Sequence, residues 1–196
     1  MILLNSLLFM NFDPYFCQME STLDAVSTQD MLSFEAFRNS VIADYRMALM
    51  SREVSLLGRR EVLTGKAKFG IFGDGKEVAQ VALAKFFQKG DFRSGYYRDQ
   101  TFMFAIGVAS IEDYFSQLYS DVYNDPFSGG KNMNAHFATE FVNKKGEWSD
   151  LTNSFNISAD IAPTAGQMVR GLGMAFASQC FRNSKHKELF SNLSNN

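Results

Sequence analysis

The sequence is short of the residues that mark several classes of protein. It has only two cysteines among 196 residues, Cys17 and Cys180, and they lie far apart. This pattern predicts reduced thiols in a cytoplasmic protein rather than a disulfide framework. Basic charge is not in excess, because the formal net charge is −2, so no nucleic-acid partner is expected. No apolar run is long enough to span a bilayer, so no membrane partner is expected either.

Hydrophobic residues, by contrast, are plentiful at 46% of the chain, which is enough to build the core of one domain. Residues 1–30 show no period and are interpreted as a tail or arm, and residues 31–196 as the domain. Helical periodicity predicts helices from Phe34 to Leu57 and from Thr164 to Phe181. Ser110 and Asp113 predict a capping box at the start of another helix.

No strand can be assigned from the pattern, so we expect a mostly helical fragment with long irregular loops. Residues 124–137 carry a proline, two glycines and three asparagines, and this composition predicts a mobile loop. Residues 139–163 have no regular period. The helix predicted from Thr164 is rich in glycine and alanine, which suggests that another backbone packs close to it.

The stretch Gly70–Lys76 resembles three phosphate-binding motifs and fails each of them. A P-loop requires Ser or Thr after the lysine, and the residue there is Glu77. A dinucleotide fingerprint requires a third glycine where Val78 stands. The Gly-Asp-Gly at residues 73–75 also resembles the opening of a thiamine diphosphate motif, but no asparagine follows before Asn124.

A helix start explains the same residues better. Asp74 and Glu77 have the spacing of a capping box, and apolar residues then recur at helical spacing up to Phe86. Gly90 is suited to end that helix in the left-handed conformation. We therefore expect a helix start that makes no direct phosphate contact.

The segment from Gly95 to Gly107 holds the strongest candidate for an anion site. Tyr97 and Arg98 stand at the expected entry to a helix, where free N–H groups and an arginine fork favour phosphate. In the alternative interpretation, Arg98 pairs with Asp99 or another surface acid and the tyrosines belong to the core. From the chemistry of these residues the two interpretations are equally favoured.

From Ser33 to Arg182 the chain resembles the alpha part of the thiamine-diphosphate-dependent decarboxylating component of 2-oxo acid dehydrogenase complexes. The closer likeness is to the branched-chain, or 2-oxoisovalerate, type. The motifs that carry it are Gly-x-Gly-x-Glu at residues 73–77, Tyr97-Arg98, "SGGKNMNAHFA" at residues 128–138 and the small-residue helix with Gln167.

The resemblance implies an α/β thiamine-diphosphate-binding fold, of which this chain would be the N-terminal portion. It implies that Tyr97 and Arg98 contact the cofactor diphosphate and that His136 acts in the active-site loop with Gly130, Lys131 and Met133. His186 is expected on the solvated surface. The reaction implied is oxidative decarboxylation of a 2-oxo acid, with acyl transfer to the lipoyl group of a partner acyltransferase.

Other parts of the family's site are expected elsewhere. The Mg²⁺ ligands are expected beyond residue 196, and the catalytic glutamate belongs to the beta part, fused or separate. The run Ala162–Gln167 departs from the family's potassium-binding run, so no metal ligand is assigned within this chain. The fragment alone is therefore expected to be inactive. The alternative function is a non-catalytic helical module that docks through its glycine-rich helix.

Overall fold

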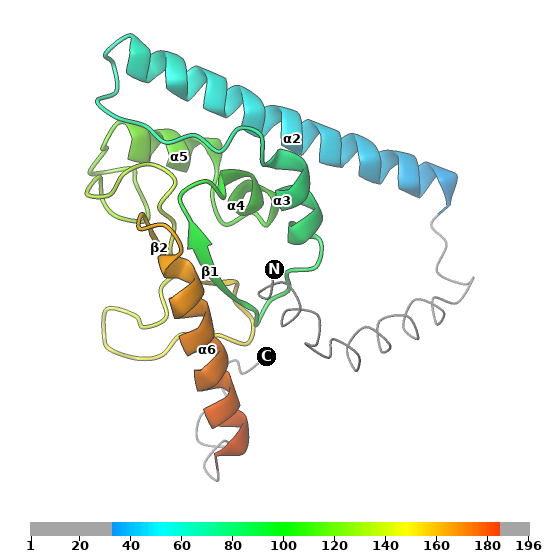
Figure 1. The fold of residues 1–196 in the computed structure, drawn as a ribbon, viewed down its shortest axis with the longest axis vertical. Helices are drawn as coiled ribbons and strands as arrows, with labels where there is room; N and C mark the ends of the chain where they lie inside the picture. Colours follow the sequence, from blue (N-terminus) through cyan, green and yellow to red (C-terminus); the bar gives the residue numbers. More distant parts are fainter. Residues whose placement is uncertain (1–32, 185–196) are drawn as a thin grey trace, which may run out of the picture. The chain divides into compact units, whose positions relative to one another are not determined.

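A computed structural model describes residues 33–184, and the chain divides after Val41 into two units. Of the first unit the described part is residues 33–41, which form the start of helix α2 (Phe34–Leu63). The expectations for residues 1–30, Cys17 and His186 lie outside the described residues. The rest of α2 and all later elements belong to the second unit (Figure 1). Those elements are α3 (Glu77–Ala84), β1 (Phe92–Tyr96), α4 (Gln100–Ala105), α5 (Ile111–Leu118), β2 (Asn156–Ile161) and α6 (Gly166–Asn183).

Helix α2 runs six residues beyond its expected end at Leu57. Gly58 does not end the helix. It lies inside the helix, where its missing side chain leaves room for a packed ring. A Cβ atom at Gly58 would lie 2.5 Å from the ring of Phe72, so only glycine lets that ring lie against the helix. The basic pair Arg59-Arg60 therefore lies in the last turns of α2.

No strand could be assigned from the sequence pattern, and the structure adds two, because β1 and β2 form a two-stranded parallel sheet. Arg93 is aligned with Ile157, and Ser94 with Ser158, before the register shifts ahead of Tyr96. The connection from β1 to β2 carries α4 and α5, as a parallel pair requires a long crossover. Figure 1 shows α6 beside this sheet, and the helix contacts both strands.

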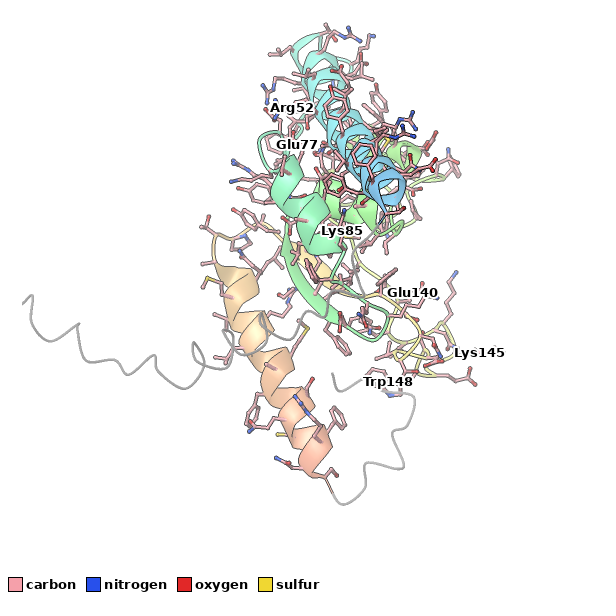
Figure 2. All side chains as sticks on the ribbon, turned by 90° about the vertical axis from the view of Figure 1, so that its right-hand side faces the viewer. Arg52, Glu77, Lys85, Glu140, Lys145 and Trp148 are labelled. Atoms are coloured by element: carbon pink, nitrogen blue, oxygen red, sulfur yellow. The ribbon has the colours of Figure 1, made fainter. Side chains whose placement is uncertain are left out.

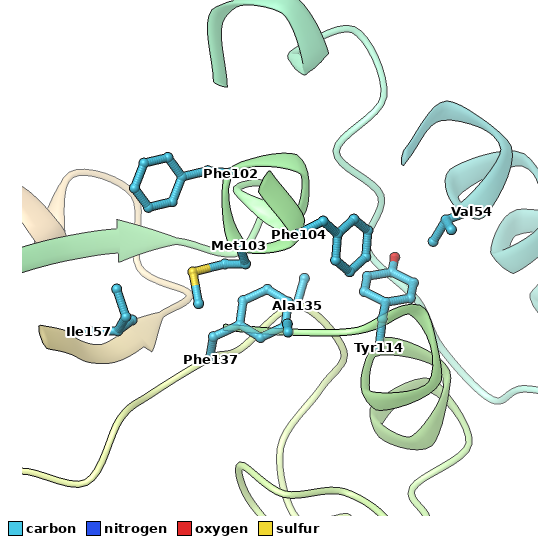
Figure 3. Packing of buried hydrophobic residues seen from close by; sticks show 9 residues of the cluster. Val54, Phe102, Met103, Phe104, Tyr114, Ala135, Phe137 and Ile157 are labelled. Carbon is cyan, nitrogen blue, oxygen red and sulfur yellow. The ribbon is translucent and has the colours of Figure 1, made fainter. Parts of the chain in front are cut away.

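The hydrophobic core lies where α4 and α5 meet the segment before β2 (Figure 3). Aromatic rings pack edge to face there: Phe104 lies 6.0 Å from Tyr114, and Phe127 lies 5.2 Å from Phe137, between ring centroids. The buried members are Val54, Phe102, Met103, Phe104, Ala109, Tyr114, Ala135, Phe137 and Ile157. The core therefore joins α4 to residues on both sides of the active-site loop predicted from the sequence.

One local prediction is confirmed. The Ser110 side chain accepts from the Asp113 N–H, and the Asp113 carboxylate accepts from the Ser110 N–H, so the capping box at the start of α5 is complete. The turn at Lys144–Gly146 is present, with Gly146 at φ +83° and a bridge between Val142 and Trp148 around it. Figure 2 shows Lys145 and Trp148 on this turn, where Trp148 is 54% exposed and so is no core residue.

The glycines of α6 do not meet a close backbone within residues 33–184. A Cβ atom at Gly173 would contact nothing within 4 Å, and one at Gly171 would make only an ordinary contact with Ser94. The helix instead exposes large apolar side chains, with Leu172 at 73% and Phe176 at 65%. No helix in the described part of the chain has the length and apolarity to cross a membrane.

Candidate functional site

Tyr97 and Arg98 occupy the two central positions of a tight turn that links β1 to α4. The Asp99 N–H donates to the Tyr96 carbonyl at 3.1 Å, and the Tyr96 N–H donates to Asp99 Oδ2 at 3.1 Å. Asp99 thus closes the turn through its backbone and through its side chain. The two side chains predicted to hold the diphosphate are therefore presented by a short, doubly bonded segment.

The alternative interpretation expected Arg98 to pair with Asp99, but these two residues do not pair. Asp99 accepts instead from Arg93 at 2.7 Å, and Arg98 makes no ion pair with any residue of 33–184. The Arg98 guanidinium is exposed and lies over the Tyr97 ring, 5.7 Å from its centroid. A cation held over an aromatic face with no acid beside it is suited to receive an anion.

The hydroxyls of Tyr96 and Tyr97 interact, and this sets their protonation. The hydrogen bond with Tyr96 raises the pKa of Tyr97, whereas Thr164, followed by Tyr97, lowers the pKa of Tyr96. The Tyr97 hydroxyl therefore keeps its proton, and an anion that Arg98 attracts has to compete with the Tyr96 oxygen for it.

The N-terminus of α4 is not the anion site that the sequence suggested. The helix has only six residues, which is too short to build a sizeable dipole. One of its free N–H groups, that of Phe102, already donates to Gln80 Oε1 at 3.0 Å, while Gln80 Nε2 donates to the Arg98 carbonyl. The side chains of Tyr97 and Arg98 are therefore the groups that this turn offers to the predicted anion.

His136 lies beside this turn, although it is almost 40 residues away in the sequence. Its ring stacks against Tyr97, with 6.4 Å between centroids and 21° between ring planes. The residue is 8% exposed, and Gln117 bonds both its N–H and its carbonyl. Ala135 before it is fully buried at φ +58°, and such strain in a non-glycine residue is typical of functional sites.

The expectation of a mobile loop at residues 124–137 fits poorly with these contacts. Asp125 accepts hydrogen bonds from the backbone of Phe127, Ser128 and Gly130, so the first half is folded around one carboxylate. In the second half, residues 134–137 are buried. The family loop residue Lys131 is exposed and Met133 is 39% exposed, so both lie at the surface beside the buried His136.

The glycine-rich stretch at residues 70–77 reaches the same place. A Cβ atom at Gly73 would lie 2.6 Å from the Arg98 carbonyl oxygen, so glycine is needed there for close backbone approach. Ile71 exchanges two hydrogen bonds with the Asn134 amide, at 2.9 and 2.6 Å. This stretch therefore packs against both the Tyr97–Arg98 turn and the segment that carries His136.

The capping box expected from Asp74 and Glu77 is absent. The residue that caps α3 is Lys76, and it makes no side-chain cap. Asp74 bonds Arg59 at 2.7 Å instead, and Glu77 accepts two bonds from Arg52, at 2.6 and 3.0 Å (Figure 2). Arginines on α2 thus pair with both carboxylates, although Glu77 Oε2 also accepts from the nearby Gly75 N–H at 2.9 Å.

Gln167, matched to the family's glutamine, lies in the first turn of α6. Its carbonyl accepts from Ser94 on β1 at 2.8 Å, which ties α6 to the sheet near the turn. Its side-chain Oε1 is buried and has no hydrogen-bond partner among the described residues. Within residues 33–184 Gln167 makes no hydrogen bond with Arg98, so its role stays a prediction.

The residues present fit a diphosphate but supply no metal site. Arg98 and Tyr97 offer a free guanidinium and a hydroxyl donor in one exposed turn. Within residues 33–184 no group of three or more His, Cys, Asp or Glu side chains is placed to hold a metal ion.

Sequence reasoning missed the residues that assemble this site. Arg93, Asp99 and Asp160 form a buried ion cluster, and Asn134 joins the glycine-rich stretch to the loop. The sequence offers no clear signal, because Arg93 and Asp160 stand in short segments of mixed polar and apolar residues. Without knowledge of the two strands, the sequence could not pair them.

Comparison with protein families first places the chain among dehydrogenases. The matching description is the dehydrogenase E1 component, and the match covers residues 26–186. The chain belongs to this family, whose members are thiamine-diphosphate-dependent decarboxylating components of 2-oxo acid dehydrogenases. Its helices and small parallel sheet are compatible with a thiamine-diphosphate-binding fold. No curated protein matches the chain in a sequence search.

Proposed function

We propose that this chain supplies the diphosphate-binding side of a 2-oxo acid dehydrogenase, with a branched-chain 2-oxo acid as substrate. Tyr97 and Arg98 bind the diphosphate of thiamine diphosphate. The observation that carries the proposal is the exposed Arg98 guanidinium, which lies over Tyr97 and has no acidic partner within residues 33–184.

Each residue of the site has a role that its surroundings support. Arg98 provides charge and two parallel donors to phosphate oxygens, which suits a diphosphate better than a single ammonium would. Tyr97 donates its hydroxyl and holds the guanidinium through its ring. The His136 ring stacks on the Tyr97 ring. From this position His136 faces the substrate carboxylate or moves a proton near it.

The remaining chemistry is assigned to groups outside the described residues. When bound, thiamine diphosphate supplies the electron sink for decarboxylation. The Mg²⁺ ligands lie beyond residue 196, and the catalytic glutamate lies on the beta part. The acyl product passes to a lipoyl group on the acyltransferase partner, in the cytoplasm. The chain by itself is inactive because these groups are missing.

Substitution of Arg98 tests the assignment in the complete enzyme. Arg98→Ala should weaken thiamine diphosphate binding about 10- to 100-fold, because it removes charge-assisted hydrogen bonds worth about 1.5–3 kcal/mol. Calorimetric titration with thiamine diphosphate and Mg²⁺ measures the change. Arg60→Ala is the matched control, since Arg60 is exposed on α2 and away from the turn. Equal affinity in the Arg98 variant and the control would refute the assignment.

The exposed apolar face of α6 favours a second candidate, a module that docks without catalysis. Met168, Val169, Leu172 and Phe176 are 65–74% exposed on this helix. Leu172→Glu and Arg98→Ala together separate the two candidates. A pure docking module loses its partner with Leu172→Glu and is unaffected by Arg98→Ala. The enzyme keeps its cofactor affinity with Leu172→Glu and loses affinity with Arg98→Ala.

A further inference from the structure

A cluster of three charged side chains, two of them buried, adjoins the turn that carries Tyr97 and Arg98. Arg93 is only 8% exposed. Its Nη2 donates to Asp99 Oδ2 at 2.7 Å, and its Nη1 lies 3.0 Å from Asp160 Oδ1. One guanidinium on β1 thus pairs with two carboxylates, one on the turn and one on β2.

The Asp99 end of the cluster holds the Tyr97–Arg98 turn. The same Oδ2 atom that receives Arg93 also receives the Tyr96 N–H. Rotation of the Asp99 carboxylate would therefore break the ion pair and the turn together.

The Asp160 end holds the segment that carries His136. Phe137, the next residue after His136, donates its N–H to Asp160 Oδ2 at 3.1 Å and accepts from the Asp160 N–H at 3.0 Å. The Asp160 side chain is fully buried. Displacement of this carboxylate would release the backbone beside His136.

The cluster is not arranged for stability alone. Arg93 Nη1 and Asp160 Oδ1 are close, but they do not align as a hydrogen bond, and both atoms lack any other partner among the described residues. Burial outweighs the Arg93 charge and raises the pKa of Asp160 to about 6. Buried ion pairs of this kind contribute little net stability, and their best-attested use is to fix one arrangement.

The strand is also shaped around the guanidinium. A Cβ atom at Gly95 would lie 1.8 Å from Arg93 Nη2, so any side chain there would push the guanidinium out of the cluster. The Arg93 guanidinium lies over the Phe102 ring as well, 5.5 Å from its centroid. The glycine and the aromatic ring leave Arg93 one position in which it can reach both carboxylates.

We propose that Arg93 is a positioning residue, which fixes the Tyr97–Arg98 turn against His136 by pairing with Asp99 and Asp160 at once. The effect of Arg93 on cofactor binding rests on the function proposed above. The effect of Arg93 on the Tyr97–His136 contact does not. Lysine cannot replace it, because one ammonium lacks the planar fork that spans two carboxylates.

The contact can be measured in the 196-residue chain without cofactor, because the chain has only two histidines. The ring protons of His136 are assigned in a ¹H–¹³C correlation spectrum with the help of His186→Gln. Tyr97→Leu removes the stacked ring and gives the reference shift for His136 without Tyr97. Arg93→Lys should move the His136 signals most of the way to that reference.

Two further variants keep the test decisive. If Arg93→Lys does not fold, Asp99→Asn takes its place, since the Asp99 side chain is 30% exposed and its loss is milder. Asp44→Asn, which breaks the distant Lys85–Asp44 pair, is the control and should leave the His136 signals unchanged. His136 signals that stay at the wild-type position in a folded Arg93→Lys or Asp99→Asn variant overturn the proposal. So does a Tyr97→Leu variant with unchanged His136 signals.

A second measurement links the cluster to the cofactor in the complete enzyme. Arg93→Lys should weaken thiamine diphosphate binding, and the Arg93→Lys/Arg98→Ala double variant should lose less affinity than the sum of the two single losses, because Arg93 acts on Arg98 through the turn. Additive losses would show that Arg93 acts on its own and would overturn the proposal. An unchanged affinity in Arg98→Ala, together with shifted His136 signals, would refute only the proposed function.

Discussion

Two arginine–carboxylate centres join elements of this chain, and they differ in their exposure to water. At the first, Arg52 forms two aligned bonds with Glu77, and its side chain is 45% exposed. At the second, Arg93 is 8% exposed and the Asp160 side chain is fully buried. The first centre joins α2 to α3, and the second joins the turn after β1 to β2.

The two carboxylates respond in opposite directions. The hydrogen bonds from Arg52 lower the pKa of Glu77 to about 2, whereas burial raises the pKa of Asp160 to about 6. The residue types are alike, so the difference comes from alignment and hydration. An aligned pair with an arginine in water stabilises the charged carboxylate, and a misaligned pair without water does not repay its desolvation.

The largest expected effect comes from removing each arginine. Arg93→Met leaves Asp160 buried without its partner and should lower the free energy of unfolding by about 3–5 kcal/mol. Arg52→Met should cost clearly less, because water can reach the pair from the exposed arginine side. Urea denaturation of both variants measures the difference. A loss as large in Arg52→Met as in Arg93→Met would abolish the distinction between the centres.

The pH dependence of stability separates the centres further. The raised pKa of Asp160 makes the folded chain bind more protons than the unfolded one, so its contribution to stability falls as pH rises from about 4 to 6, on the order of 3 kcal/mol in all. The lowered pKa of Glu77 gives stability that is present above about pH 4.5 and is lost as pH falls towards 2.

Unfolding free energies of Asp160→Asn and Glu77→Gln, each compared with wild type across pH 3 to 7, test these signs. The wild-type chain should lose stability relative to Asp160→Asn between pH 4 and 6. It should gain stability relative to Glu77→Gln from pH 3 to about 4.5. Parallel curves for wild type and Asp160→Asn would mean that Asp160 titrates normally.

The smallest effects concern one glycine at each centre. Gly95→Ala displaces the Arg93 guanidinium and should cost about 1–3 kcal/mol. Gly75, whose N–H bonds Glu77, has φ +91° and no neighbour within 4 Å of a Cβ, so Gly75→Ala should cost only backbone strain of about 1 kcal/mol.

A double-variant design makes this last comparison decisive. Gly95→Ala should cost little more once Arg93→Met is present, because the group it displaces is gone. Gly75→Ala should cost the same in either background. Denaturation of the two double variants measures the cost of each glycine substitution in the Arg93→Met background. If the losses from Gly95→Ala and Arg93→Met were additive, the strand would tolerate a side chain beside Arg93.

Local sequence signals predicted the elements whose stabilising bonds are local. The helix from Phe34 begins after Ser33, whose hydroxyl accepts from the Ala36 N–H, and the capping box at Ser110 formed as expected. The helix predicted from Thr164 to Phe181 is close to α6. The starts at Ser33 and Ser110 each depend on residues three positions apart, so the local sequence carries that information.

Where distant groups compete, the local signals failed. Asp74 and Glu77 have the spacing of a capping box, but Arg59 and Arg52 on α2 take both carboxylates. The strands β1 and β2 escaped prediction because each is short and carries a buried charge, Arg93 or Asp160. Such charges read as surface residues until the partner strand is known.

The sequence by itself determined the family and the candidate residues Tyr97, Arg98 and His136, because the order and spacing of motifs can be read without knowing any contacts. Only the tertiary structure decided that these three lie together, that Arg98 has no acidic partner within residues 33–184 and that Arg93 joins Asp99 to Asp160. The physical reason is that desolvation and pairing depend on distances between segments that lie many residues apart in the chain.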